Sequence, residues 1–240
     1  MIEDILPAGT ASAEAFGDPP GLVLFPEEEV PVTRAVEIRR REFTTARARA
    51  RTALATLGVA SAPIMPGKRG APQWPPGVVG SITHCAGYRA AAVAHACDVL
   101  TIGLDAEPDE VLPGGVLETV SLPGERERLR ALAAIEPSTS WDRLLFCTKE
   151  ATYKAWFPLA GRWLGFADAD ITIDAADGGF ETRLLVPTPP VSGSPLAGFT
   201  GRWLARDGLI VAAITVMTKP NRAASAAAET DPGLHRTAGA

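Results

Sequence analysis

One order of predicted elements, a helix followed by a loop and then by strands, occurs in both halves of the chain and limits the folds open to it. Residues 32–58 have a helical pattern that ends at Gly58, and the proline- and glycine-rich residues 63–76 are predicted to form a loop. A second helix is predicted over residues 141–156. The chain therefore combines helices and strands in each half, without a short tandem repeat.

The predicted strands are short apolar segments with turn residues between them. The best supported covers residues 99–107, because its β-branched content is high and Pro108 closes it. Residues 90–95 also allow a helix, because a short apolar run does not distinguish the two. The other predicted strands are residues 78–83, 171–175, 182–186, 198–205 and 209–216.

The remaining segments hold a further helix and two irregular regions. Residues 110–135 are predicted to be a helix that breaks near Pro123. Residues 10–31 are rich in Gly, Pro and Glu, and we expect them to be irregular. Residues 219–240 have no large apolar side chain except one leucine, so we expect a disordered tail there.

The charge and the cysteine content argue against several classes of protein. The 240 residues, 46% of them hydrophobic, can bury the core of one large domain or two small ones. A net charge of -5 argues against a general nucleic-acid binder. The three cysteines have no paired spacing, which disfavours disulfides and zinc. No leader or membrane-length apolar segment is found, so we expect a cytoplasmic, soluble protein.

The motif Gly-Leu-Asp-Ala-Glu-Pro ends the strand predicted over residues 99–107. Side chains alternate between the faces of a strand, so Asp105 and Glu107 point the same way. Two carboxylates this close repel each other unless a cation lies between them, and hard oxygen ligands suit Mg²⁺. The alternative, an acidic pair that faces solvent at the end of a strand, is the commoner meaning of so short a motif.

The apolar helix predicted over residues 141–156 contains a short charged segment, Lys-Glu-Ala-Thr-Tyr-Lys, at residues 149–154. Glu150 and Lys154 are i,i+4 neighbours on one face of this helix. Glu150 is a candidate third metal ligand or proton acceptor, and Lys149 and Lys154 are candidates for holding phosphate oxygens. An ordinary ion pair on the protein surface is the alternative.

Arginines are frequent in the helix predicted over residues 32–58. Its apolar stripe consists of Val36, Phe43, Ala50, Leu54 and Leu57. Arg39 falls within this stripe and Arg47 at its margin, whereas Arg41 and Arg49 point away. A guanidinium that borders a core-facing stripe needs a partner, and a phosphate is a suitable bidentate one. A solvated basic face is the alternative.

Two further segments hold candidate ligand contacts. The loop around Lys68 and Arg69 lacks the glycine and the Ser or Thr that a Walker motif requires. Its two cations are candidates for binding a phosphate, and an ordinary exposed turn is the alternative. His84 follows a predicted strand, where a lone histidine is more often structural. Cys85 is its neighbour and points to the opposite face, so the two do not form a nucleophile and base.

The order and spacing of these motifs resemble one family. G-L-D-A-E-P followed some forty residues later by C-T-K-E-A-T-Y-K-A-W resembles the paired signature of the Sfp and EntD type phosphopantetheinyl transferases. R-R-R-E-F, G-S-I-T-H-C and W-L-G-F look like the actinobacterial PptT branch, and the likeness covers roughly residues 31–216. It implies a pseudo-twofold α+β fold of two similar α/β halves, with the active site in the cleft between them. We expect the halves at residues 1–106 and 107–218, followed by a tail at 219–240.

The resemblance also implies roles for the candidate residues. Magnesium, with manganese as a possible substitute, is expected on Asp105, Glu107 and Glu150 with the Ala106 carbonyl nearby. The residues expected to contact coenzyme A are Arg39, Arg47, Lys68, Arg69, Thr83, His84, Asp105, Lys149, Glu150 and Lys154. Glu150, Lys154 and Asp105 are the expected catalytic residues, with Glu150 as the base. Pro66 stands where the close branch is expected to have a lysine.

The implied reaction moves the 4'-phosphopantetheine group of coenzyme A onto a serine of an apo acyl or peptidyl carrier protein and releases 3',5'-ADP. Fatty-acid, polyketide, nonribosomal peptide and siderophore biosynthesis use such carriers. An apolar and partly basic surface near Trp156, Phe157, Arg162 and Trp163 is a candidate for receiving the carrier, and we expect a monomer without membrane or nucleic-acid partners. Two alternatives stay open: a magnesium-dependent phosphohydrolase, and a nucleic-acid binder that would place its arginines outward.

Overall fold

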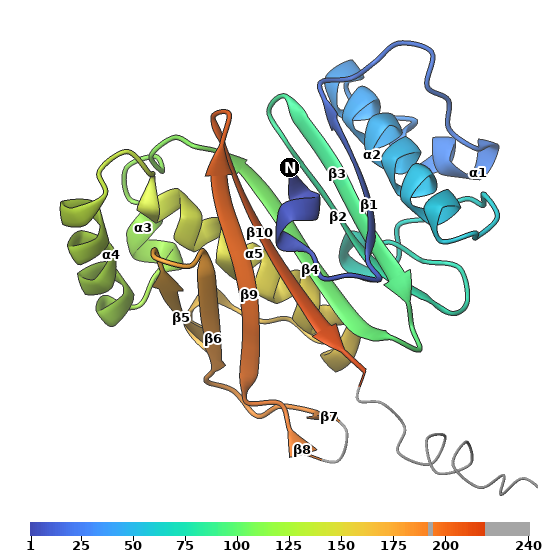
Figure 1. Cartoon of the computed structure of the whole chain (residues 1–240). Coiled ribbons are helices and arrows are strands. Elements are labelled where there is room, and N and C mark those ends of the chain that lie inside the picture. The colour runs from blue at the N-terminus through green and yellow to red at the C-terminus, as the bar shows by residue number, and fades with distance from the viewer. Residues whose placement is uncertain (192–193, 219–240) are drawn as a thin grey trace, which may run out of the picture.

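The computed structural model describes residues 1–191 and 194–218, which form a mixed α and β fold (Figure 1). Within these residues, a three-stranded antiparallel sheet has the order β1-β3-β2 and a five-stranded antiparallel sheet the order β4-β10-β9-β6-β5. Two 20-residue helices, α2 (Glu37–Thr56) and α5 (Trp141–Ala160), each cover one of these sheets. The expected α+β class is confirmed.

The first half packs α2 against the three-stranded sheet. Its strands are β1 (Ala11–Phe16), β2 (Val78–Cys85) and β3 (Tyr88–His95). The central strand β3 is buried on both faces, which explains its continuous run of small apolar residues. Ala50, Ala53 and Leu54 of α2 belong to the core beneath the helix.

The second half packs α5 against β4 and β10 of the five-stranded sheet. The strands of this sheet are β4 (Val99–Pro108), β5 (Ala169–Asp174), β6 (Gly179–Leu184), β9 (Gly198–Arg206) and β10 (Leu209–Met217). Gly103 allows the helix to approach closely, because a Cβ atom there would lie 2.0 Å from the Ala151 carbonyl oxygen. The absence of a side chain at Gly103 therefore determines how near α5 comes to β4.

The two sheets meet where β2 and β4 run side by side. Side-chain hydroxyls replace a backbone ladder at this seam: the Leu104 amide donates to Ser81 Oγ and the Ala106 amide to Thr83 Oγ1, each over 3.0 Å. A domain boundary after residue 106 would cut through β4. The hydrogen bonding instead changes between β3 and β4, at residues 96–98.

Most of the predicted elements are confirmed, with shifts at their ends. The helix predicted from residue 32 begins at Glu37, and residues 90–95 are strand. The predicted helix over 110–135 is two helices, α3 (Val116–Val120) and α4 (Pro123–Ile135), and Pro123 occupies the first turn of the second, where its missing N–H costs nothing.

Residues 10–31 differ from the expected irregular segment. They contain the strand β1 as well as α1 (Pro26–Glu29), and the short 3-10 helix η2 (Val30–Val32) follows directly. Two further short strands, β7 (Pro190–Val191) and β8 (Ser194–Pro195), pair with each other. The predicted tail at 219–240 lies outside the described residues. Among the residues described, none of the helices combines the length and the apolar character that crossing a membrane requires.

Candidate active site

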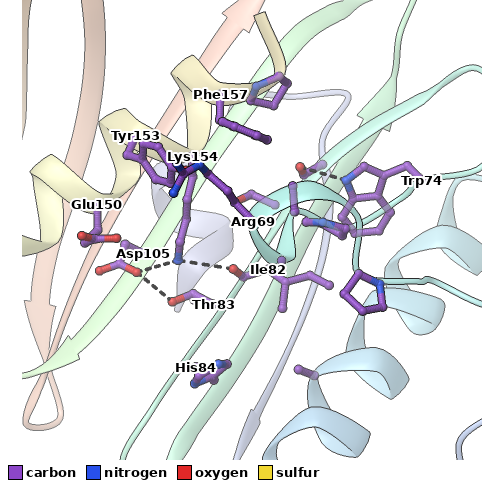
Figure 2. Close-up of a pocket in the computed structure, with 18 of the residues that line it drawn as sticks. Arg69, Trp74, Ile82, Thr83, His84, Asp105, Glu150, Tyr153, Lys154 and Phe157 are labelled. Carbon is purple, nitrogen blue, oxygen red and sulfur yellow. Dashed lines mark hydrogen bonds and ion pairs between the residues drawn. The ribbon is translucent and has the colours of Figure 1, made fainter. Parts of the chain in front are cut away.

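A cavity of about 780 Å³ lies between the two halves, and the predicted site residues that it gathers come from both of them. Its wall is formed by α2, the loop of residues 66–74, β2, β4 and α5 (Figure 2). Helix α2 contributes Arg39 and Arg47, whereas α5 contributes Glu150 and Lys154. The expected location of the site in a cleft between two halves therefore agrees with the shape of the molecule.

Asp105 lies at the seam between the sheets and is almost fully buried. Its Oδ1 atom accepts hydrogen bonds from Thr83 Oγ1 over 3.2 Å and from Lys154 Nζ over 2.7 Å (Figure 2). Its buried Oδ2 atom has no hydrogen-bond partner among the described residues. A carboxylate oxygen without a partner is costly in a protein interior, and a cation is a suitable ligand for it.

Glu150 and Glu107 bring two further carboxylates to the cavity. Burial, together with the nearby charge of Asp105, raises the pKa of both groups above the ordinary value for glutamate. Lys154 opposes this shift at Glu150. At Glu107 it is opposed by Arg143, whose Nη1 lies 3.1 Å from the carboxylate.

The carboxylates of Asp105, Glu107 and Glu150 suit a hard divalent cation, although they do not converge on one point. The charge of Asp105 raises the pKa of both Glu107 and Glu150, so a positive charge between the three carboxylates would stabilise them. Within the described ranges, no three His, Cys, Asp or Glu side chains converge tightly enough to form a ready metal site. Ala106, between the two strand carboxylates, is fully buried.

Lys154 crosses the cleft from α5 to the sheet seam. Its ammonium donates to Asp105 and to the carbonyl oxygens of Leu104, at 3.0 Å, and Ile82, at 3.4 Å. Burial alone would lower the pKa of this ammonium, but the charges of Asp105 and Glu150 hold it above the ordinary value for lysine. Lys154 is therefore a permanent positive charge directly beside the carboxylates.

The opposite end of the cavity carries the two predicted arginines of α2. The guanidinium of Arg47 is buried, donates through Nε to the Ile64 carbonyl over 2.7 Å and stacks on the Phe43 ring at 4.1 Å. Burial lowers the pKa of Arg47 to about 10, which still leaves it charged at neutral pH. Arg39 is half exposed and donates to His84 Nε2 over 2.6 Å.

His84 is a neutral hydrogen-bond acceptor in this arrangement. Burial first, and then the charges of Arg39 and Lys154, lower the pKa of its imidazole from 6.5 to about 4. Burial also raises the pKa of the adjacent Cys85 thiol to about 12, so Cys85 stays protonated at neutral pH. This agrees with the expectation that Cys85 and His84 do not act as nucleophile and base.

The loop of residues 66–74 brings one of its two predicted cations to the cavity. Arg69 lines the cavity and lies over the Trp163 ring at 5.1 Å, so it spans from the first half to the second. Lys68 is exposed and is not part of the cavity wall. Pro66 forms part of the wall and pairs with Pro72 across the base of the loop.

The structure places Lys149 away from the cavity, so the predicted phosphate contact of this residue is corrected. Its side chain is 1% exposed and points away from the cavity, and its ammonium lies 2.9 Å from Glu125. The same ammonium donates to the carbonyl oxygens of Phe166 and Ala169. All three of its hydrogens are thus used within the core. The reason is helical geometry, because Lys149 and Lys154 are about 140° apart around α5.

Several residues that line the cavity were not predicted from the sequence. Tyr153 lines the cavity, packs on Trp163 with 4.7 Å between ring centroids, and has a buried hydroxyl without a partner in the described chain. Trp156, which we expected near a surface, is fully buried, whereas Trp163 is 55% exposed. Other wall residues not anticipated are Phe43, Trp74, Ser81 and Phe146. Helical spacing from Glu150 would have identified Phe146 and Tyr153.

The sequence is similar to proteins of known activity. A family model described as the 4'-phosphopantetheinyl transferase N-terminal domain matches residues 27–94, and one for the 4'-phosphopantetheinyl transferase superfamily matches residues 101–194. Among curated relatives, 4'-phosphopantetheinyl transferase Npt of Nocardia iowensis is 54% identical over 222 residues, which cover 89% of this chain and 99% of the relative.

Two further relatives cover similar shares of the chain. The 4'-phosphopantetheinyl transferase Svp of Streptomyces mobaraensis is 53% identical over 219 residues, or 90% of this chain and 89% of the relative. The 4'-phosphopantetheinyl transferase PptT of Mycobacterium tuberculosis is 49% identical over 225 residues, or 90% and 98%. The similarity therefore extends across both halves of the cleft.

Proposed function

The chain belongs to the 4'-phosphopantetheinyl transferase superfamily, and we propose that it moves the 4'-phosphopantetheine group of coenzyme A onto a serine hydroxyl of an apo acyl or peptidyl carrier protein. The observation that carries this proposal is Asp105. One of its oxygens is held by donors from both halves, and the other is buried near Glu150 with no hydrogen-bond partner in the described part of the chain. A carboxylate arranged in this way suits a cation that binds a diphosphate.

Coenzyme A is the donor in this family, and the positive end of the cavity suits its nucleotide. Arg47 and Arg39 present guanidinium groups to the cavity, and such groups bind phosphate oxygens in a bidentate manner. Arg69 adds a third positive charge from the loop. His84, neutral and already within reach of Arg39, completes this end. The basic character is local, although the whole chain is acidic.

A divalent cation would be held by Asp105, Glu107 and Glu150, with Mg²⁺ as the expected ion and Mn²⁺ as a substitute that also favours oxygen ligands. When bound there, it supplies charge neutralisation for the diphosphate of coenzyme A. Glu107 would exchange its contact with Arg143 for this role. The bare Asp105 oxygen and the raised pKa of both glutamates support this assignment.

The transfer forms a bond between the serine oxygen and the β-phosphorus and breaks the bond from that phosphorus to the bridging oxygen. The pantetheine phosphate stays on the serine, and 3',5'-ADP leaves. Glu150 is the carboxylate of α5 that lines the cavity, and in this proposal it receives the serine proton. Lys154 holds Asp105 in place beside it.

The carrier protein approaches at the rim of the cavity where Trp163 is exposed. Arg162 lies beside it in the chain and stacks on the buried Trp156 ring at 5.3 Å, so the rim is both apolar and basic. We expect the protein to act as a monomer, because one chain contributes both walls of the cavity. A nucleic-acid role is disfavoured, since Arg47 is buried and Arg39 faces the cavity rather than an open surface.

The direct test is the intact mass of a purified apo carrier protein after incubation with this protein, coenzyme A and Mg²⁺. We expect a gain of about 340 Da, one phosphopantetheine from the phosphoryl transfer, and its loss when EDTA is added. Breakdown of coenzyme A without a mass gain on several acyl and peptidyl carriers would instead support the phosphohydrolase alternative.

A further inference from the structure

Thr83 was expected to contact the nucleotide, but its hydroxyl is already used. The side chain is 1% exposed, and Oγ1 donates to Asp105 Oδ1 while accepting the Ala106 amide hydrogen. A threonine hydroxyl has a single hydrogen to donate. Once that hydrogen is directed to Asp105, the hydroxyl cannot donate to a phosphate oxygen as well.

The same contact determines which oxygen of Asp105 is free. Thr83 comes from β2 in the first half and Lys154 from α5 in the second, and both donate to Oδ1. Two donors on one oxygen fix the rotation of the carboxylate and leave Oδ2 without a hydrogen bond from residues 1–191 or 194–218. Figure 2 shows Glu150 beside this carboxylate, opposite the side on which Thr83 lies.

We infer that Thr83 is a positioning residue for the transfer: it holds Asp105 by Oδ1 so that Oδ2 stays available to the cation bound with coenzyme A. This inference rests on the proposed function. Groups that orient the ligands of a metal commonly contribute about 10- to 100-fold to metal affinity or activity, although they never touch the metal.

Ser81 provides a matched control two residues earlier on β2. It is also buried, and its Oγ accepts the Leu104 amide at 3.0 Å, as Thr83 accepts that of Ala106. Among the described residues, Ser81 has no hydrogen bond to a carboxylate. Substitution at either position therefore leaves one buried amide of the seam without its acceptor, but only Thr83 also holds Asp105.

The experiment compares Thr83→Val, Thr83→Ser and Ser81→Ala with the wild type. Valine has the shape of threonine without the hydroxyl, and serine retains the hydroxyl. Three measurements concern activity and stability: kcat and KM for carrier modification, the Mg²⁺ concentration that gives half the maximal rate, and Tm. Two concern binding. The affinity for Mn²⁺ is obtained from the electron paramagnetic resonance of free Mn²⁺, and the affinity for coenzyme A is measured in EDTA.

For Thr83→Val we expect kcat and Mn²⁺ affinity to fall on the order of tenfold or more, with the affinity for coenzyme A in EDTA little changed. Thr83→Ser should restore most of both. Ser81 also lines the cavity, so kcat is not compared at this position. Ser81→Ala should lower Tm about as much as Thr83→Val does, while Mn²⁺ affinity stays near that of the wild type.

Two results would overturn the inference. Equal losses of Mn²⁺ affinity in Thr83→Val and Ser81→Ala would mean that the seam only needs its buried amides satisfied. A large loss of coenzyme A affinity in EDTA would mean that Thr83 contacts the nucleotide directly. If the wild type modifies no carrier, the proposed function fails instead, and the comparison of Mn²⁺ affinities still decides the role of Thr83.

Discussion

At the scale of single residues, the carboxylates of the cleft account for most of the chemistry that it can perform. Asp105→Asn and Glu150→Gln keep the shape of each side chain but remove its charge. We expect each to lower the rate of carrier modification on the order of 10³-fold, because stabilisation of the transferring phosphoryl group depends on that charge. Tm should stay close to that of the wild type in Glu150→Gln, whereas Asp105→Asn also removes the buried counter-charge of Lys154 and should lower Tm.

Glu118→Gln is the matched control for this pair. Glu118 is exposed on α3, so the same loss of charge there should leave the rate unchanged. A rate for Asp105→Asn within threefold of the wild type would remove Asp105 from the site. The measurement is the initial rate of mass gain on an apo carrier at saturating coenzyme A.

His84 makes stability depend on pH in a defined direction. The pKa of its imidazole falls from 6.5 to about 4 in the folded chain, so between these values the unfolded chain binds a proton that the folded chain does not. Stability is therefore lost as the pH falls through this window. Relative to His84→Gln, the wild type should lose about 2 kcal/mol of unfolding free energy between pH 7.5 and pH 5.

Urea unfolding at several pH values measures this difference. The glutamine variant retains a hydrogen-bond acceptor for Arg39 and does not titrate, so the stability of the wild type relative to this variant should fall as the pH falls. Parallel curves would show that His84 titrates at its ordinary pKa in the folded protein.

The individual site residues were predictable where spacing alone determines the contact. Asp105 and Glu107 share a face because strands alternate, and Glu150 and Lys154 share one because helices repeat every 3.6 residues. The true partner of Lys149 was not predictable, because Glu125 lies in a separate helix. Helical geometry alone, however, already separates Lys149 from the face that carries Glu150 and Lys154.

At the scale of elements, the approach of α5 to β4 determines how near the helix carboxylate lies to the strand carboxylates. In Gly103→Ala the added methyl group would meet the Ala151 carbonyl oxygen at 2.0 Å and the Ala155 nitrogen at 2.7 Å. Both are backbone atoms and cannot move aside singly. We expect a loss of about 1–3 kcal/mol or more in unfolding free energy, and a lower kcat in the protein that folds.

Gly124→Ala serves as the comparison for Gly103→Ala. Gly124 lies in α4, where an added Cβ meets only the flexible end of Arg128 at 3.5 Å. Because Gly124 lies in the first turn of the helix, alanine there should change the unfolding free energy by less than the roughly 0.5–1 kcal/mol typical of the middle of a helix. A Gly103→Ala variant as stable as the wild type would contradict the close packing of α5 on β4.

The buried pair of Lys149 and Glu125 joins α5 to α4. Both side chains are 1% exposed, and Glu125 also accepts the amides of Leu122 and Ile171. Lys149→Met leaves a buried carboxylate without its counter-charge, so we expect a loss of about 3–5 kcal/mol in the unfolding free energy. Combining it with Glu125→Gln should recover part of that loss.

Coenzyme A binding distinguishes this structural role of Lys149 from a role in holding phosphate. In the double variant, the KM for coenzyme A should stay within about twofold of the wild type, because the ammonium lies outside the cavity. A tenfold rise in KM with full stability would restore the phosphate contact that the sequence suggested.

Long periodic elements were predictable from the sequence, and elements that depend on distant partners were not. The helix α5 is periodic over its whole length and was found, with its end four residues later than expected. β1 was missed because its sequence, Ala-Ser-Ala-Glu-Ala-Phe, has low intrinsic strand preference. Pairing with the buried strand β3, more than seventy residues away, makes it a strand.

At the scale of the whole molecule, two helix-covered sheets meet at a seam that side chains hold together. Ser81 and Thr83 bond β2 to β4 in place of a backbone ladder, and the cavity follows that seam. The order of helix, loop and strands in each half was visible in the sequence. The position of the seam was not, because it depends on β4 pairing with β10, a hundred residues further along.

The central claim is that the cleft carboxylates hold the cation on which transfer depends. Its most direct test is a titration of Mn²⁺ into the protein bound to coenzyme A, in which electron paramagnetic resonance measures the free Mn²⁺. We predict one ion per chain in the wild type and in Glu118→Gln, and an affinity weakened at least about tenfold in Asp105→Asn and in Glu150→Gln. Equal affinities in all four proteins would contradict the claim and place the cation elsewhere.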